Sequence, residues 1–153
     1  MRPLNYLRKK KEQVRKLLIV VGKMGSGKST FVKMLVCPKD SRDMPHGVEI
    51  KITCSKQSVT SECTIYKAHP SHNLLPDEEQ LYVMDTPGLN SNDSASLIVE
   101  RINQGILDEG SKNKVYYEIV GVAYVQTLSS ERYVTEKGES PLRELIDLLK
   151  VKM

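Results

Sequence analysis

Residues 20–30 read VVGKMGSGKST, and this stretch decides the fold. The pattern G-x-x-x-x-G-K-S runs from Gly22 to Ser29. An apolar run of strand length, residues 17–21, precedes it, and residues 29–36 can continue as a helix. A strand, a glycine-rich loop and a helix in this order form a cradle for nucleotide phosphates. The sequence therefore predicts a phosphate-binding loop rather than a glycine-rich turn that fits the pattern by chance.

Each part of this loop has a chemical task. Gly25 and Gly27 let the backbone curl around a phosphate group without a side chain in the way. The amides of residues 25–30 then point at phosphate oxygens, with the positive end of the helix dipole behind them. Lys28 places a point charge near the β- and γ-phosphates, and the Ser29 hydroxyl can complete a Mg²⁺ shell. The candidate nucleotide-binding residues of the loop are Gly22, Met24, Gly25, Ser26, Gly27, Lys28, Ser29 and Thr30.

Length and composition indicate one globular domain. The chain has 153 residues, of which 39% are hydrophobic and 27% charged, and these values fit a single packed core. No apolar run approaches the roughly 20 residues that span a bilayer, and no signal-peptide pattern opens the chain. The cysteines lack metal-ligand spacing, so we expect reduced thiols in a cytoplasmic protein. They are Cys37, Cys54 and Cys63.

The positive charge is concentrated at the start of the chain. Residues 1–16 hold seven Lys or Arg and one Glu, whereas the whole chain has a net charge of +4. We therefore divide the chain into a basic arm at 1–15 and a domain at 16–153. The arm is a candidate for peripheral contact with anionic lipid or nucleic acid. A solvated lead-in segment is favoured, because no aromatic or apolar face accompanies the charges, and we expect no specific nucleic-acid partner.

The rest of the chain alternates between strand and helix patterns. Strands are expected within residues 48–52, 59–68, 80–84 and 115–126. The run at 119–125 is nearly continuously apolar, which predicts burial on both faces, as in a parallel sheet. Helices are expected through residues 97–110 and 141–149. This alternation predicts an α/β fold with a mostly parallel sheet and flanking helices.

A second motif, Asp85-Thr86-Pro87-Gly88, follows the apolar strand at 80–84. A carboxylate in this position emerges at the carboxyl end of the sheet, beside the phosphate loop. Asp85 can there hold a water bound to Mg²⁺, and the Gly88 amide can reach a γ-phosphate. Such a contact would let the following loop distinguish a triphosphate from a diphosphate.

A threonine from the segment between the two motifs should complete the Mg²⁺ shell. Thr60 lies between a polar loop and a strand, where a mobile ligand is expected. Thr64 has a strand position and is the structural alternative. The spacing favours Thr60 only modestly. The candidates are Thr53, Thr60 and Thr64.

Three segments together resemble one GTPase family. The phosphate loop, SVTSEC at 58–63 and DTPGL at 85–89 are similar to the avirulence-induced-gene type GTPases, also called immunity-associated nucleotide-binding proteins. A fourth stretch, residues 124–136, is similar to the family's strand and the Arg-Phe-Thr-Glu-like box that follows it, here with Tyr133 and Val134. The resemblance covers residues 16–150, although septins and chloroplast-import GTPases share the first and third motifs.

The resemblance implies a Ras-like (TRAFAC) P-loop NTPase fold that binds GTP or GDP with Mg²⁺, and a nucleotide-dependent homodimer across the nucleotide face. It also makes Thr60 the switch threonine. We therefore expect Lys28, Thr60 and Gly88 to take part in catalysis, and Ser29, Thr60 and Asp85 to hold the metal. Ras-like proteins place a water-positioning glutamine just after the third motif, but Leu89 and the residues that follow it offer none. We therefore expect slow GTP hydrolysis that a partner or a second subunit completes.

One family feature is missing from the sequence. The guanine-reading motif, Asn/Thr-Lys-x-Asp or Arg-Lys-x-Asp, does not occur after residue 88. We therefore expect a partial G domain at 16–153, and guanine specificity rests on the resemblance alone. The strand at 119–125 would then form an edge of the sheet. Two other functions compete: a P-loop ATPase or kinase, and a truncated nucleotide-binding or scaffold protein without catalysis that pairs through this edge.

Overall fold

The computed structural model describes residues 13–50, 62–72, 74–76, 79–88, 94–127 and 147. The helix expected at 141–149 lies outside this part of the chain, apart from Asp147. Within the described residues, no helix is both long and apolar enough to cross a bilayer. The elements in chain order are β1 (Gln13–Gly22), α1 (Lys28–Val36), β2 (Thr64–Lys67), the 3₁₀ helix η1 (Pro70–His72), β3 (Leu81–Asp85), α2 (Ala95–Asn113) and β4 (Val115–Val125).

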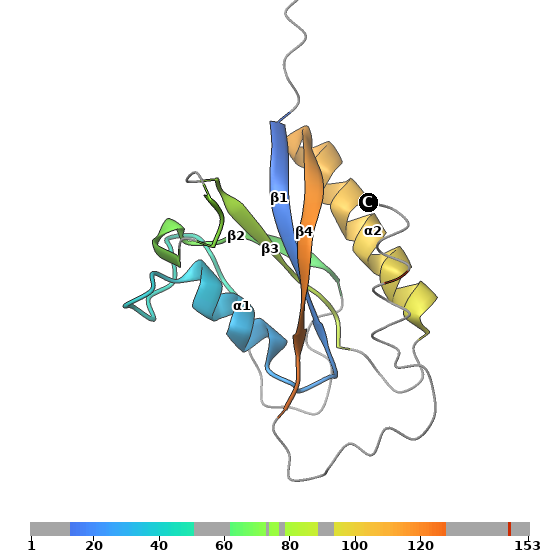
Figure 1. The fold of residues 1–153 in the computed structure, drawn as a ribbon, viewed down its shortest axis with the longest axis horizontal. Helices are drawn as coiled ribbons and strands as arrows, with labels where there is room; N and C mark the ends of the chain where they lie inside the picture. Colours follow the sequence, from blue (N-terminus) through green and yellow to red (C-terminus); the bar gives the residue numbers. More distant parts are fainter. Residues whose placement is uncertain are drawn as a thin grey trace, which may run out of the picture.

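The four strands form one mixed sheet in the order β2-β3-β1-β4. β1 pairs in parallel with both β3 and β4, whereas β2 is antiparallel to β3. α1 lies on one side of the sheet and α2 on the other (Figure 1). The prediction of an α/β fold with flanking helices is confirmed, and β1 takes the central position.

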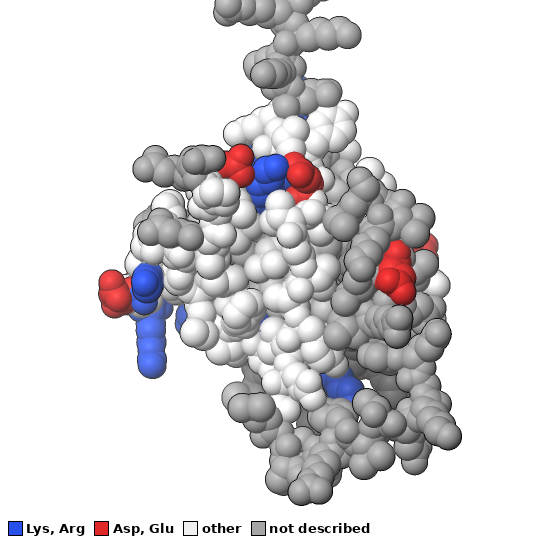
Figure 2. Space-filling model, viewed as in Figure 1, with Lys and Arg blue, Asp and Glu red and all other residues white. Residues whose placement is uncertain are grey.

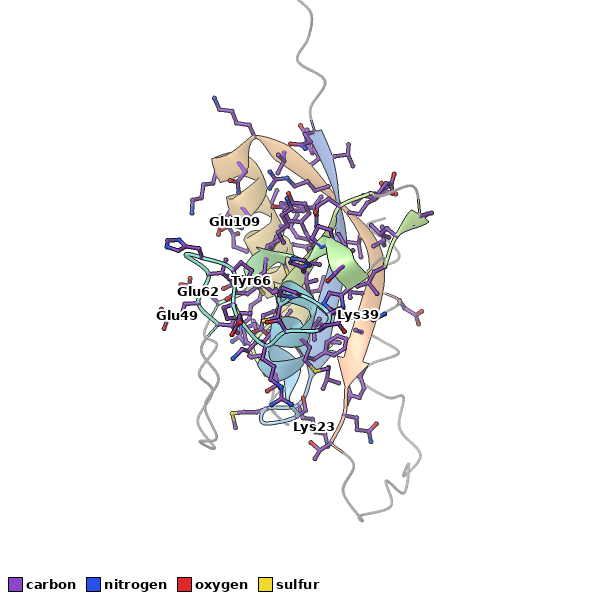
Figure 3. All side chains as sticks on the ribbon, turned by 90° about the vertical axis from the view of Figure 1, so that its left-hand side faces the viewer. Lys23, Lys39, Glu49, Glu62, Tyr66 and Glu109 are labelled. Atoms are coloured by element: carbon purple, nitrogen blue, oxygen red, sulfur yellow. The ribbon has the colours of Figure 1, made fainter. Side chains whose placement is uncertain are left out.

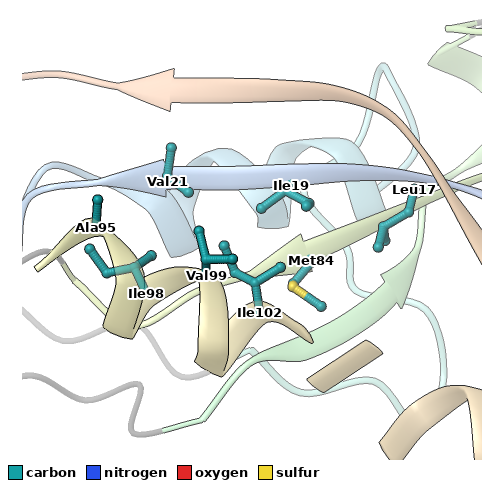
Figure 4. Close-up of a cluster of buried hydrophobic side chains, with 8 residues drawn as sticks. All are labelled: Leu17, Ile19, Val21, Met84, Ala95, Ile98, Val99 and Ile102. Atoms are coloured by element: carbon teal, nitrogen blue, oxygen red, sulfur yellow. The ribbon is translucent and has the colours of Figure 1, made fainter. Parts of the chain in front are cut away.

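β1 is central because its apolar run supplies side chains to both faces of the sheet. Leu17, Ile19 and Val21 alternate toward α2, where they pack in a buried cluster with residues of that helix (Figure 4). Val20 points to the other face and packs with α1 residues in a second cluster. Burial of apolar side chains at about 25 cal/mol per Å² makes these two clusters the main stabilising contribution to the fold. The strand therefore holds the loop that follows it in a fixed position.

β1 begins earlier than the apolar run predicts, at Gln13. The Arg15 guanidinium lies 4.6 Å from the centre of the Tyr82 ring, an attractive cation–π contact. Lys16 forms an ion pair with Glu118 on β4. Both basic residues therefore have partners inside the sheet. Both the favoured solvated segment and the alternative of lipid contact concern mainly residues 1–12, which lie outside the described part of the chain.

β4 is not buried on both faces, so that prediction is wrong. Tyr116 is 57% exposed and Val120 42% exposed, and Glu118 lies exposed between them on the same face. The register shifts where Leu18 pairs with Gly121, so Val120 is the extra residue of a β-bulge. These side chains are exposed because β4 lies at the edge of the described sheet and α2 packs only on its opposite face. In the view of Figure 2, which is that of Figure 1, the described surface carries few charged side chains.

The strand expected at 48–52 does not form in its described part. Val48 donates its amide to the Pro45 carbonyl at 3.1 Å in a turn that contains Gly47. Val48 and Ile50 pack against the cluster under α1. Their apolar alternation reflects loop packing rather than pairing with a strand. The strand expected within 59–68 is present over its described part as β2.

The carboxyl end of α1 is tied to the connection between β2 and β3. The His69 amide donates to the Leu35 carbonyl at 2.8 Å, and the His72 Nε2 atom lies 2.8 Å from the Cys37 carbonyl oxygen. The Lys39 amide donates to the Ser71 hydroxyl at 2.8 Å. Lys23 and Lys39, labelled in Figure 3, flank the helix at its two ends. These bonds satisfy backbone groups that a helix end otherwise leaves unpaired.

Candidate phosphate and metal site

The loop between β1 and α1 adopts a tight glycine-dependent turn. Gly25 has φ 76° and Gly27 has φ 93°, and both lie in the left-handed region that glycine adopts without a steric penalty. The Ser26 amide donates to the Lys23 carbonyl at 3.1 Å and closes the turn. The Ser26 hydroxyl oxygen is buried without a hydrogen-bond partner among the described residues. Gly25 and Gly27 therefore occupy positions where the backbone has a positive φ that favours glycine.

The amino end of α1 is open to an anion. Gly27 occupies the N-cap position and supplies no side-chain hydrogen bond to the helix, and the first turn contains no acidic residue. Amides of a first helical turn have no acceptor within the helix, and the helix dipole places partial positive charge there. Together with the curled loop, this end of the helix suits a phosphate group.

Lys28 is a buried cation at the start of α1. Only 6% of the residue is exposed, and its Nζ atom donates to the Lys23 carbonyl at 2.9 Å. Burial lowers the pKa of Lys28, while the nearby Asp85 charge acts in the opposite direction. A cation held out of water gains from an incoming anion, so a phosphate beside Lys28 would be bound strongly.

Asp85 lies at the end of β3, next to the loop. It pairs in register with Val20 of β1, and its Oδ2 atom accepts a hydrogen bond from the Ser29 hydroxyl at 2.7 Å. Its Oδ1 atom is buried without a hydrogen-bond partner in the described part of the structure. Burial raises the pKa of Asp85, and the Ser29 bond, the Lys28 charge and the Thr86 amide oppose this shift. The two sequence motifs therefore meet through Ser29 and Asp85.

This donor set fits Mg²⁺. The Ser29 hydroxyl and the free Oδ1 of Asp85 are hard oxygen ligands, and Mg²⁺ binds through one or two such groups together with phosphates and waters. The described residues contain no cluster of three or more His, Cys, Asp and Glu side chains that could hold a metal alone. Ser29 and Asp85 would hold the ion, which would neutralise phosphate charge.

The second motif also contacts the tip of the loop. A Cβ atom on Gly88 would lie 2.6 Å from the Met24 Cα atom and 2.9 Å from its nitrogen. Pro87 and Gly88 are buried at this contact. Only glycine fits so close to another backbone, so the residue predicted to sense a γ-phosphate is already packed on the loop.

The three threonine candidates have different outcomes. Thr64 lies directly opposite Asp85 in the antiparallel pairing of β2 with β3. Thr53 and Thr60 lie outside the described residues, as does Leu89. Burial and the Asp85 charge both raise the pKa of Tyr66, two residues after Thr64 on the same strand. The structure therefore brings Thr64 close to the site, and the assignment of Thr60 stays a prediction.

Thr86 is a residue that the motif analysis did not single out. Its side chain is fully buried, and its hydroxyl donates to the Val20 carbonyl at 2.7 Å. The only sequence signal that could have identified Thr86 is its place as a polar residue directly after an apolar strand, inside a candidate motif. The acceptor on β1 becomes visible once the strands are paired.

Replacing Asp85 by asparagine should stabilise the ligand-free protein. Because the pKa of Asp85 is raised above 3.8, the folded state holds this proton more tightly than the unfolded chain does. The carboxylate therefore destabilises the fold increasingly as the pH rises from 3.8 through the raised value. We expect D85N to gain about 1 kcal/mol in unfolding free energy at pH 7, the scale of one buried polar group without a partner.

Urea unfolding of D85N and the wild type from pH 4 to pH 8 measures this difference. The gap should widen as the pH rises and then level off. The exposed carboxylate of Glu100 on α2 supplies the control, since E100Q should show no such gap. A D85N variant that is less stable at pH 7 would mean that attraction between Asp85 and Lys28 outweighs the burial of the charge.

Comparison with known proteins assigns no family to this site. No protein-family model matches the sequence, and a search of curated proteins finds no match. The resemblance carried by the loop and by residues 58–63 and 85–89 therefore stays a prediction from the motifs. The function must be argued from the geometry of Lys28, Ser29 and Asp85.

Proposed function

We propose that this protein binds GTP with Mg²⁺ as a nucleotide-dependent switch and hydrolyses it slowly. The observation that carries the proposal is the 2.7 Å hydrogen bond between Ser29 and Asp85 at the base of the glycine loop. It joins the two motifs that a Mg²⁺–triphosphate site requires. The open end of α1 and the buried Lys28 supply the complementary charge for phosphates.

The arrangement of the strands is compatible with a Ras-like P-loop fold, which the family resemblance implies. The loop follows a central parallel strand, and Asp85 ends the neighbouring strand β3. Ligands of open α/β sheets bind outside the carboxyl ends of the strands. The phosphate and metal parts of the proposal rest on described residues, whereas the preference for guanine rests on the resemblance.

Titration of fluorescent GTP and ATP with and without Mg²⁺ tests the proposal. We expect GTP to bind at least about tenfold more tightly than ATP, a difference of about 1.4 kcal/mol, and Mg²⁺ to strengthen its binding. Equal affinities would favour the P-loop ATPase interpretation. Absence of Mg²⁺-dependent binding to either nucleotide would contradict the proposal. Phosphate release should be slow, on the order of 10⁻⁴ s⁻¹ or below, because no glutamine that could position water follows directly after Gly88.

A non-catalytic interaction protein is the second candidate, and β4, which is an edge strand within the described part of the chain, favours it. Unpaired edges and exposed apolar side chains such as Tyr116 and Val120 promote pairing with another chain. A switch that dimerises across its nucleotide face should change its size when GTP is added. A scaffold that pairs through β4 should keep the same size with or without nucleotide, and also in the K28A variant. Light scattering after size exclusion distinguishes the two.

A further inference from the structure

The Thr86 side chain joins the two central strands behind the phosphate loop. The last pair of the β1–β3 ladder is Val20 with Asp85. One residue further on, the Thr86 hydroxyl donates to the carbonyl of Val20 at 2.7 Å. Val20 is itself fully buried, between β3 and β4. The acceptor is therefore a rigid reference point that does not depend on the loop.

We propose that Thr86 is a positioning residue, which sets the Asp85 carboxylate for Mg²⁺ and holds Gly88 at the loop; this rests on the function proposed above. The hydroxyl of Thr86 is anchored to the Val20 carbonyl on β1. This bond fixes the chain immediately after the metal ligand. As a result, Oδ2 of Asp85 meets Ser29 and Oδ1 is left available.

The same anchor acts on the other side of Thr86. Pro87 and Gly88 follow directly, and Gly88 packs within van der Waals distance of the Met24 backbone. A chain free to rotate after Asp85 would lose this contact as well. Metal and phosphate sites lose much of their affinity when a supporting bond is removed and the ligands shift by about 1 Å. Thr86 therefore places Asp85 and Gly88 together.

Packing alone does not explain a threonine here. Valine has nearly the same shape and would fill the same space without a buried hydroxyl. Burying a hydroxyl carries a desolvation penalty, which its one hydrogen bond to Val20 offsets. The net gain in stability is small, so the main effect of the hydroxyl is to fix the path of the backbone after Asp85.

The test compares T86V, which removes only the hydroxyl, with T86S, which keeps it. Binding of fluorescent GTP is measured over a series of Mg²⁺ concentrations and in EDTA. T86V should raise the Mg²⁺ concentration at half-maximal effect by about tenfold or more, as loss of a supporting bond to a metal ligand does. Affinity in EDTA should fall much less, because Lys28 and the loop residues themselves are unchanged and only the Gly88 contact is loosened. T86S should restore the wild-type Mg²⁺ dependence. T127V, an exposed threonine-to-valine change after β4, serves as the matched control.

Each outcome decides the proposal. An unchanged Mg²⁺ midpoint in T86V overturns it, and so does an equal loss of affinity in Mg²⁺ and in EDTA, which would mark a merely structural role. If T86V does not fold, T86A takes its place with the same expected shift. Wild-type protein that binds no GTP under any condition would overturn the proposed function and this inference together. Normal wild-type binding that K28A abolishes and T86V leaves unchanged would overturn the inference alone.

Discussion

Changing Lys28 to alanine should abolish binding of the Mg²⁺–triphosphate. The variant removes a buried cation whose Nζ atom lies at the start of α1, beside the curled loop. Charge-assisted hydrogen bonds to phosphate contribute about 1.5–3 kcal/mol each, so losing two of them weakens binding by about 100-fold or more. Isothermal titration with GTP and Mg²⁺ measures the loss.

The control for this variant is K39A. Lys39 is exposed beyond the other end of α1, so its loss changes the net charge equally without touching the loop (Figure 3). We expect K39A to bind like the wild type, and both variants to keep the wild-type circular dichroism spectrum. If K28A retained its affinity, the phosphates would have to bind elsewhere, and the site built from Ser29 and Asp85 would lose its function.

Substitution of Gly22 by alanine should cause the largest loss of stability among these changes. A Cβ atom there would lie 2.3 Å from the carbonyl oxygen of Val125 and 2.8 Å from the Ser26 Oγ atom. The first of these neighbours is backbone and cannot rotate away. Overpacking of this kind destabilises a protein by about 1–3 kcal/mol, and relief would require the end of β1 to part from β4. Chemical unfolding measures the difference.

G121A is the matched control for G22A. Its added Cβ would meet the end of the Leu18 side chain at 3.3 Å, and a flexible side chain can give way by a few tenths of an ångström. We expect G121A to change the unfolding free energy by less than about 1 kcal/mol. Similar losses in the two variants would mean that the end of β4 adapts as easily as the Leu18 side chain does.

The sequence predicts the conformation of the glycine loop better than it predicts the sheet around it. The glycine spacing identifies the loop, because positive φ at Gly25 and Gly27 is a local requirement. The strands and the helix through residues 97–110 follow from apolar periodicity, and α2 confirms the latter over Ala95–Asn113. These signals depend only on residues that are close together in the sequence.

Properties that depend on distant partners could not be predicted in this way. Arg15 and Lys16 resemble the other solvated charges at the start of the chain until Tyr82 and Glu118 are placed beside them. The exposure of β4 depends on which strand lies beyond it and which helix covers it, and the residues of β4 alone predict neither. The pairing of Thr64 with Asp85 and the hydroxyl bond of Thr86 likewise require the register of the sheet.

Helix α1 is a short rigid connection between the phosphate loop and the segment between β2 and β3. One end carries the open amides and Lys28, and the other is bonded through the carbonyls of Leu35 and Cys37 to His69 and His72. A nine-residue helix is only about 13 Å long and bends little over that length. Any change in the orientation of α1 at the loop would therefore also shift the β2–β3 connection, to which the other end of the helix is bonded.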